Sequence, residues 1–189
     1  MKKWFFFGDQ ETQEGEMGMK RKRTLNNLKI HALFVLYVYA LFKFILFKFG
    51  AIDMTFLRQQ LKQSLGNPDD ITVRLQKGNL IPFKEISRSI HVLSIHDLIN
   101  MIGNIAIFMP FGIFLGFMLR NKKISLIGAF TLSLGLSLIL ESAQALFSIG
   151  SFDVDDLILN SSGGLIGFIA CKVCAKFMAT TLQTKGRPI

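Results

Sequence analysis

The chain has 189 residues, of which 50% are hydrophobic, and its mean hydropathy is +0.41. A soluble domain of this size does not need several apolar runs of about twenty residues, which is the length that spans a bilayer. The formal net charge of +9 would suit a nucleic-acid partner, but the basic residues flank the apolar runs, as they do in membrane proteins. We therefore expect an all-α membrane protein and no nucleic-acid partner.

Taken in chain order, the apolar runs predict four transmembrane helices, at 30–49, 98–119, 124–147 and 157–180. These spans would form a single transmembrane domain over 30–181, between a tail at 1–29 and a tail at 182–189. One sizeable loop of 48 residues, at 50–97, joins the first two spans. The expected fold class is a four-transmembrane-helix bundle with one extracytoplasmic loop segment.

The loop at 50–97 is expected to contain local structure. Apolar residues recur at helical spacing over 52–65, which predicts a short amphipathic helix. The following stretch at 71–83 is interpreted as a small hairpin or as an extended segment lying on the membrane. Because an isolated hairpin is only marginally stable, we expect it to pack against the bundle.

Proline and glycine in the spans predict how the helices pack. Pro110 should kink the second span and free a backbone carbonyl, which a neighbouring helix can satisfy. Gly112 with Gly116, and Gly163 with Gly167, are pairs of small residues spaced four apart. Such pairs allow the backbones of two membrane helices to approach closely.

The distribution of basic residues predicts the orientation in the membrane. Seven basic residues precede the first span, and the short loop at 148–156 has no Lys or Arg. The loop at 50–97 carries six basic and five acidic residues, but they lie mostly far from the span ends, where the positive-inside rule is weaker. We expect a multi-pass protein of the bacterial plasma membrane with both termini in the cytoplasm.

Polar side chains gather near the same end of all four apolar runs. Alternating spans would place these side chains in one layer beneath the outer surface. They lie a similar number of residues from the outer helix ends, and each residue adds about 1.5 Å of depth. Polar groups inside a membrane are costly unless they are paired, so they indicate a functional site. The sequence predicts a polar pocket lined by Lys43, Asn104, Glu141, Gln144, Asp153, Asp155, Asp156 and Asn160.

The aspartates at 153–156 allow several roles. Either Asp153 or Asp155 is expected to cap the fourth helix, because aspartate is favoured at helix N-termini. Together with Asp156 they could bind a divalent cation through oxygen ligands. If the protein is an enzyme, Glu141 and Asp156 are the candidate catalytic carboxylates.

Three sequence blocks carry a family resemblance. They are NIAIFMPFG at 104–112, ESAQ at 141–144 and FDVDDLILN at 152–160, the last followed by Gly163, Gly164 and Gly167. With NLIPF at 79–83, they make the chain resemble the VanZ-like family of small bacterial membrane proteins. The resemblance implies a cell-envelope protein linked, through the family's name-giving member, to low-level teicoplanin resistance.

The chain also departs from the family pattern. Many members have a basic residue shortly before the aspartates, where this chain has Gly150 and Ser151. Many also have a proline after the glycine block of the second span, where Leu115 and Gly116 stand here. Lys43 is the residue that could take the place of the missing basic partner.

Three functions remain open from the sequence. The first is a factor that lowers glycopeptide susceptibility by binding, or altering access to, a lipid-linked wall precursor through the outer-leaflet pocket. The second is a membrane-embedded enzyme that acts on a lipid head group. The third is a structural protein that assembles with other membrane proteins.

Overall fold

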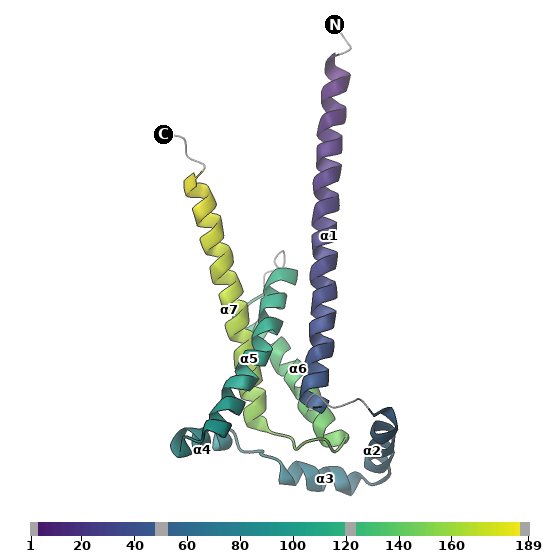
Figure 1. Cartoon of the computed structure of the whole chain (residues 1–189), viewed down its shortest axis with the longest axis vertical. Coiled ribbons are helices and arrows are strands. Elements are labelled where there is room, and N and C mark those ends of the chain that lie inside the picture. The colour runs from purple at the N-terminus through teal and green to yellow at the C-terminus, as the bar shows by residue number, and fades with distance from the viewer. Residues whose placement is uncertain (1–3, 48–52, 120–123, 186–189) are drawn as a thin grey trace.

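The computed structural model describes residues 4–47, 53–119 and 124–185, and these residues form helices without a named strand. Figure 1 shows their arrangement. The elements are α1 (Trp4–Phe47), α2 (Met54–Gly66), α3 (Pro68–Lys77), α4 (Lys84–Val92), α5 (Ile95–Met118), α6 (Leu126–Leu146) and α7 (Val154–Lys185).

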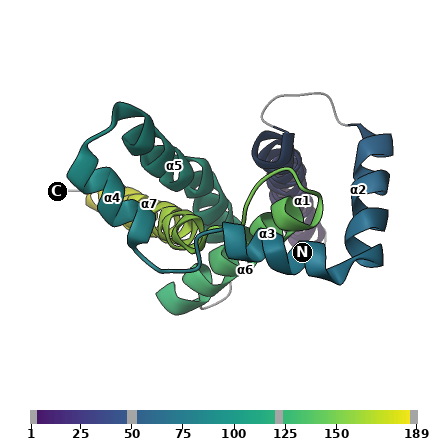
Figure 2. The same ribbon diagram turned by 90° about the horizontal axis from the view of Figure 1, so that it is seen from below.

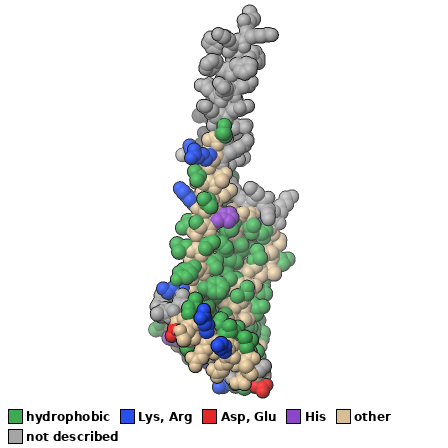
Figure 3. All heavy atoms as spheres, turned by 90° about the vertical axis from the view of Figure 1, so that its right-hand side faces the viewer, with side chains coloured by type: hydrophobic (Ala, Val, Ile, Leu, Met, Phe, Trp, Pro, Cys, Tyr) green, Lys and Arg blue, Asp and Glu red, His purple; other side chains and the backbone are tan. Residues whose placement is uncertain are grey.

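Four of the described helices are long and apolar enough to cross a membrane, in parts of α1, α5, α6 and α7. They alternate in direction, so that both chain termini lie at one end of the bundle and α2, α3 and α4 lie at the other (Figure 1). Hydrophobic side chains cover the middle of the face shown in Figure 3, with basic side chains above and below them. The predicted all-α, four-span architecture is confirmed.

The first helix is longer than the sequence suggested. A tail was expected to end at residue 29, but α1 runs unbroken from Trp4 to Phe47 and extends beyond the rest of the bundle (Figure 1). Its apolar stretch is Thr24–Leu46. Parts of four predicted segments lie outside the described residues: residues 1–3 of the N-terminal tail, the end of the span at 30–49, the start of the loop at 50–97, and residues 186–189 of the C-terminal tail.

Helices α5 and α7 form the closest pair of the described helices, and both carry the glycine pairs that the sequence marked for close approach. A Cβ atom at Gly112 of α5 would overlap the backbone of Gly164 in α7. Equally, a Cβ at Gly163 or Gly167 of α7 would overlap the backbone of α5. Because only glycine lacks this atom, these positions allow the two helix backbones to touch.

Helix α1 packs against α5 beside the proline kink. In a regular helix the Ala106 carbonyl would accept the N–H of residue 110. Because proline has no N–H, Pro110 leaves this carbonyl without its helical partner. The next carbonyl, of Ile107, accepts a hydrogen bond of 2.7 Å from the Tyr37 hydroxyl of α1. The neighbouring helix therefore contacts the same turn, but its hydroxyl bonds to the carbonyl next to the one that Pro110 frees.

The helices α2, α3 and α4 cross the end of the bundle opposite the termini (Figure 2). The amphipathic helix predicted at 52–65 is confirmed as α2, but the predicted hairpin at 71–83 is wrong, because α3 occupies 68–77. Pro68 at the start of α3, with Arg74 and Lys77 in its last turn, favours a helix there.

Helices α2 and α3 are attached to the C-terminal end of α6. The Ser64 hydroxyl donates to the carbonyl of Leu146 at 2.7 Å. The Arg74 guanidinium donates to the Ser64 hydroxyl at 3.2 Å and to the carbonyl of Ala145 at 3.4 Å. These bonds use carbonyls that a helix leaves unpaired at its last turn, and a cation is stabilised there.

Candidate functional site

A polar cavity of about 590 Å³ lies where α4 and the ends of α1, α5, α6 and α7 meet. The loop between α6 and α7 also contributes to its wall, through Ile149, Gly150 and Ser151. Ser151 and Gly150 are exposed, so the cavity reaches the molecular surface on this side. The acidic residues in its lining are Glu85, Asp97, Glu141, Asp153, Asp155 and Asp156, and the basic residue is Arg88.

The structure places seven of the eight predicted pocket residues in the wall of this one cavity: Asn104, Glu141, Gln144, Asp153, Asp155, Asp156 and Asn160. The exception is Lys43, which is exposed and does not line the cavity. Its neighbours Phe44 and Ile45 do so instead. The Gln144 amide donates to the Ile45 carbonyl at 3.1 Å, which joins α6 to α1 at the cavity wall.

The inner wall is built by hydrogen bonds between helices. Asp156 and Asn160 lie one turn apart on α7 and therefore share a face. The Asn104 amide of α5 donates to the carboxylate of Asp156, and the Asn160 amide donates to the Ser137 hydroxyl of α6 at 2.9 Å. Glu141 lies one turn from Ser137, and its Oε2 accepts the backbone N–H of Asp153 at 3.1 Å. Three helices thus present polar groups to one space.

Two of these inner groups are deeply buried. Glu141 is 2% exposed and Asn160 is 3% exposed. The Oδ1 atom of Asn160 has no hydrogen-bond partner in the described part of the structure. Buried polar atoms in native proteins are usually paired, so an unpaired one that lines a cavity calls for an explanation.

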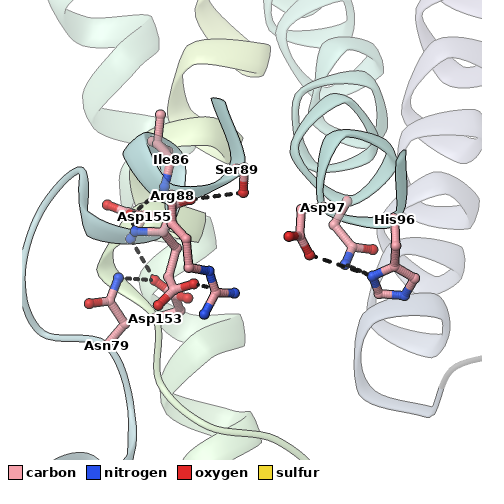
Figure 4. Close-up of polar contacts among 10 residues, drawn as sticks. Asn79, Ile86, Arg88, Ser89, His96, Asp97, Asp153 and Asp155 are labelled. Carbon is pink, nitrogen blue, oxygen red and sulfur yellow. Dashed lines mark hydrogen bonds and ion pairs between the residues drawn. The ribbon is translucent and has the colours of Figure 1, made fainter. Parts of the chain in front are cut away.

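The Asp153 side chain caps the fourth span, which is one of the two options that the sequence left open. Its Oδ1 accepts the backbone N–H of Asp155 at 2.8 Å in the first turn of α7. The same oxygen accepts the Asn79 amide at 2.9 Å (Figure 4). Backbone bonds between Asn79 and the strand-like residues 152–154 reinforce this contact. The segment before α4 is therefore tied to the start of α7.

Asp155 caps a different helix. It is 1% exposed, and its two oxygens accept the backbone N–H groups of Phe83 at 2.5 Å, Glu85 at 2.7 Å and Ile86 at 3.1 Å. Figure 4 shows Asp155 beside Ile86. These N–H groups form the N-terminus of α4, which has no capping side chain of its own. A carboxylate is favoured there because it satisfies unpaired donors and the helix dipole.

The backbone of Phe83 adopts a left-handed conformation, with φ of 66°. This conformation is uncommon for a bulky residue and persists where surrounding contacts enforce it. The Asp155 carboxylate supplies such a contact through the Phe83 N–H. The position of α4 over the cavity is thus set by an acid of α7.

These contacts do not support the three-aspartate metal site considered from the sequence. The described residues contain no group of three or more His, Cys, Asp or Glu side chains placed to hold a metal ion. The physical reason is that Asp155 is occupied by three backbone donors, while Asp153 accepts from Asn79 and from α7. Asp156 is the aspartate of this set that belongs to the inner wall with Glu141.

Comparison with known proteins agrees with the resemblance seen in the sequence. The model of the VanZ/LLP1 family matches residues 34–175, which is most of the chain. The chain belongs to the VanZ/LLP1 family. The matched stretch contains every residue that lines the cavity.

A curated VanZ relative is Protein VanZ of Enterococcus faecium, to which the chain is 35% identical over 100 residues. The aligned part covers 51% of this chain and 61% of that protein, so it spans less than two thirds of the relative's length. No solved structure matches the chain.

The basic residue that lines the cavity comes from α4, and not from the loop before the aspartates or from Lys43. Arg88 of α4 lines the cavity, and its guanidinium pairs with Glu85 at 2.7 Å. Its side chain is 60% exposed, which places it at the mouth of the cavity. Sequence reasoning proposed Lys43 for this role and missed Arg88. The available signal was the i,i+3 spacing of Glu85 and Arg88, which suits a helix.

Residues at the start of α5 complete the rim. Asp97 and Asn100 line the cavity, and Figure 4 shows Asp97 beside the exposed ring of His96. The ring Nδ1 lies 3.7 Å from an Asp97 oxygen and 3.4 Å from the Asn100 amide. The rim therefore holds charged and polar groups in contact with solvent, whereas Glu141 and Asn160 form the buried inner end.

Proposed function

We propose that this VanZ/LLP1 protein lowers the susceptibility of the cell to teicoplanin-type glycopeptides by binding, or altering access to, a lipid-linked cell-wall component. The observation that carries this proposal is the acid-lined cavity at one end of four membrane-length helices. A lipid-linked molecule could place its polar part in such a cavity while its hydrocarbon chain stays beside the apolar spans. The kinship with Protein VanZ supports the same cellular role.

The proposal requires the cavity to open toward the outer leaflet, where wall components are assembled. The charge distribution supports this orientation, because seven basic residues precede the first predicted span and the loop that contributes Gly150 and Ser151 has no Lys or Arg. By the positive-inside rule the termini then lie in the cytoplasm. The protein is accordingly proposed to be a multi-pass plasma-membrane protein with an outward-facing cavity.

A binding role explains the inner wall better than helix association alone. Hydrogen bonds between membrane helices contribute about 0.6 kcal/mol each on average. The described helices already associate through glycine contacts between α5 and α7, and Glu141 is buried although those contacts do not need it. Buried ionisable groups in spans usually mark a ligand or ion pathway.

A membrane-embedded enzyme acting on a lipid head group is a second candidate. The observation that favours it is the presence of Glu141 and Asp156, from two different helices, in the wall of the same cavity. Two carboxylates in one site can serve as general acid and base. Purified protein incubated with labelled lipid-linked precursor distinguishes the two functions, since an enzyme yields a product and a binder yields saturable retention alone.

The cellular proposal is tested with Glu141→Gln, which keeps the shape of the side chain and removes its charge. We expect cells that express this variant to become as susceptible to teicoplanin as cells that lack the protein, because the buried carboxylate can no longer attract the ligand. The measurement is the inhibitory concentration at equal membrane expression. Asp69→Asn, on the exposed surface of α3, is the matched control and should leave susceptibility unchanged. Full protection by Glu141→Gln would overturn the proposal.

A further inference from the structure

The acids in the cavity differ in how many hydrogen bonds or ion pairs their oxygens already make. Asp155 accepts three backbone N–H groups, and Asp153 accepts from Asn79 and from α7. Glu85 is paired with Arg88. These three acids therefore have structural partners.

The inner end of the cavity has hydrogen-bond acceptors that are not in use among the described residues. A carboxylate offers about four acceptor positions. Among the described residues, Glu141 accepts one backbone N–H and Asp156 accepts one amide. The Oδ1 of Asn160, buried in the same wall, accepts none. What this end lacks is hydrogen-bond donors and positive charge.

From this arrangement we propose that the inner end of the cavity receives a primary ammonium group. Its N–H donors would pair with the carboxylates of Glu141 and Asp156 and with the unpartnered Oδ1 of Asn160. The inference rests on the proposed function, in that the cavity is taken to be a binding site, and it adds the chemical class of the bound group.

The lining argues against other cations. A bound Ca²⁺ needs six to eight oxygen ligands, and the described residues hold no group of three or more His, Cys, Asp or Glu side chains placed to hold a metal ion. A quaternary ammonium cannot donate a hydrogen bond to Asn160 and is normally recognised by an aromatic cage. Among the described residues that line the cavity, Phe44 is the only aromatic one. A primary amine fits both the charge and the unpaired acceptor.

Two membrane molecules can present such a group. One is a lipid with an ethanolamine head group, and the other is a lipid-linked wall precursor with a free amino group on its peptide. Both molecules carry the same ammonium group. The experiment must therefore test whether a primary amine is preferred, and also which of the two molecules supplies it.

The test uses the purified full chain in nanodiscs of phosphatidylglycerol, with ligand retention measured by native mass spectrometry. One pair of probes is phosphatidylethanolamine and phosphatidylcholine, which differ in N-methylation. The other pair is a lipid-linked muropeptide with its amine free or acetylated. In at least one pair we expect the primary amine to be retained about tenfold better, the effect of losing a charged hydrogen bond.

Substitutions of the two inner carboxylates test whether the preference for the free amine arises at the inner end of the cavity. Glu141→Gln and Asp156→Asn should each abolish the preference for the free amine, while Asp69→Asn should keep it. Thermal unfolding in the same nanodiscs identifies a variant that fails to fold, and the other variant then serves as the test. A preference that survives in both folded variants would overturn the inference.

The remaining outcomes separate this inference from the proposed function. No retention of any probe overturns the ammonium site and also counts against the wall component as ligand. Equal retention of the free and acetylated precursors, without any preference between the two lipids, overturns it while leaving the wall-component function intact. A preference for phosphatidylethanolamine with no retention of either precursor supports the ammonium site and counts against the wall component as ligand.

Discussion

The adjacent aspartates of this protein show how residues with the same chemistry take different tasks through small changes in position. Asp153 caps α7, Asp155 caps α4, and Asp156 joins Asn104 in the inner wall. Successive side chains on the first turn of a helix point in different directions, which separates the three carboxylates. Two of the three therefore hold helix ends in place at the cavity, where all three line the wall.

The role assigned to Asp155 predicts a loss of stability on substitution. Asp155→Asn removes the charge and one of the acceptor oxygens, so that buried N–H groups at the start of α4 lose their partner. We expect the free energy of unfolding to fall by about 1–3 kcal/mol, measured by thermal or denaturant unfolding in detergent. Asp155→Ala should cost more, and Asp69→Asn on the exposed face of α3 should cost little. A fully stable Asp155→Ala protein would contradict the capping role.

The sequence identified most of the site because membrane spans restrict where a residue can lie. Once the spans alternate, depth follows from position, and this argument placed Asn104, Glu141 and Asn160 in one layer. It failed for Lys43, because depth does not determine which way a side chain faces. It also missed Arg88, since the position of α4 depends on a contact with Asp155, seventy residues away in sequence.

At the scale of elements, α5 and α7 are the most closely packed pair of the described helices. Glycine on both helices lets the two backbones meet, and the buried rings of Phe111 and Phe168 pack in the core beside them. Both helices also carry inner-wall residues, Asn104 on α5 and Asp156 on α7. The close packing therefore fixes the separation of polar groups on the two helices.

The packing predicts unequal effects of the same substitution at two glycines of α5. Gly112→Ala should lower the free energy of unfolding by about 1–3 kcal/mol, because the new methyl group meets the backbone of α7. Gly103→Ala, where nothing lies within 4 Å of the new atom, should be neutral or stabilising because alanine favours helix. Equal unfolding midpoints for the two variants would contradict the close contact between α5 and α7.

The short helices mark where sequence patterns were least informative. The amphipathic pattern of α2 was sufficient to predict a helix, whereas α3 was taken for a hairpin. Local signals for α3 were mixed, with β-branched residues at 71–73 but Pro68 at its start. Its contact with α6 through Arg74 tips this balance, and such a tertiary contact is not visible in the local pattern.

At the scale of the whole molecule, the direction of the bundle in the membrane determines what the cavity can reach. Both termini lie at the end opposite α2, α3 and α4 (Figure 1). An outward-facing cavity therefore requires both termini to be cytoplasmic, and one labelling experiment tests the two statements together.

We expect a cysteine at Ser151, exposed in the loop beside the cavity, to react in intact cells with a thiol reagent that cannot cross the membrane. Arg21→Cys, exposed on α1 near the other end, should react only after permeabilisation. Both are made in a background with Cys171 and Cys174 replaced by alanine, so that the native thiols do not contribute. The reverse labelling pattern would place the cavity on the cytoplasmic side.

The attachment of α4 separates the entrance of the cavity from the packing of the spans. One wall of the cavity comes from a connecting segment, residues 79–92, which is held by side chains at the start of α7 and lies outside the glycine-packed pair. Changes in that segment can alter the shape and charge of the entrance while the spans keep their arrangement. Substitutions in this one stretch can therefore reshape the entrance without touching the contacts that hold the bundle together.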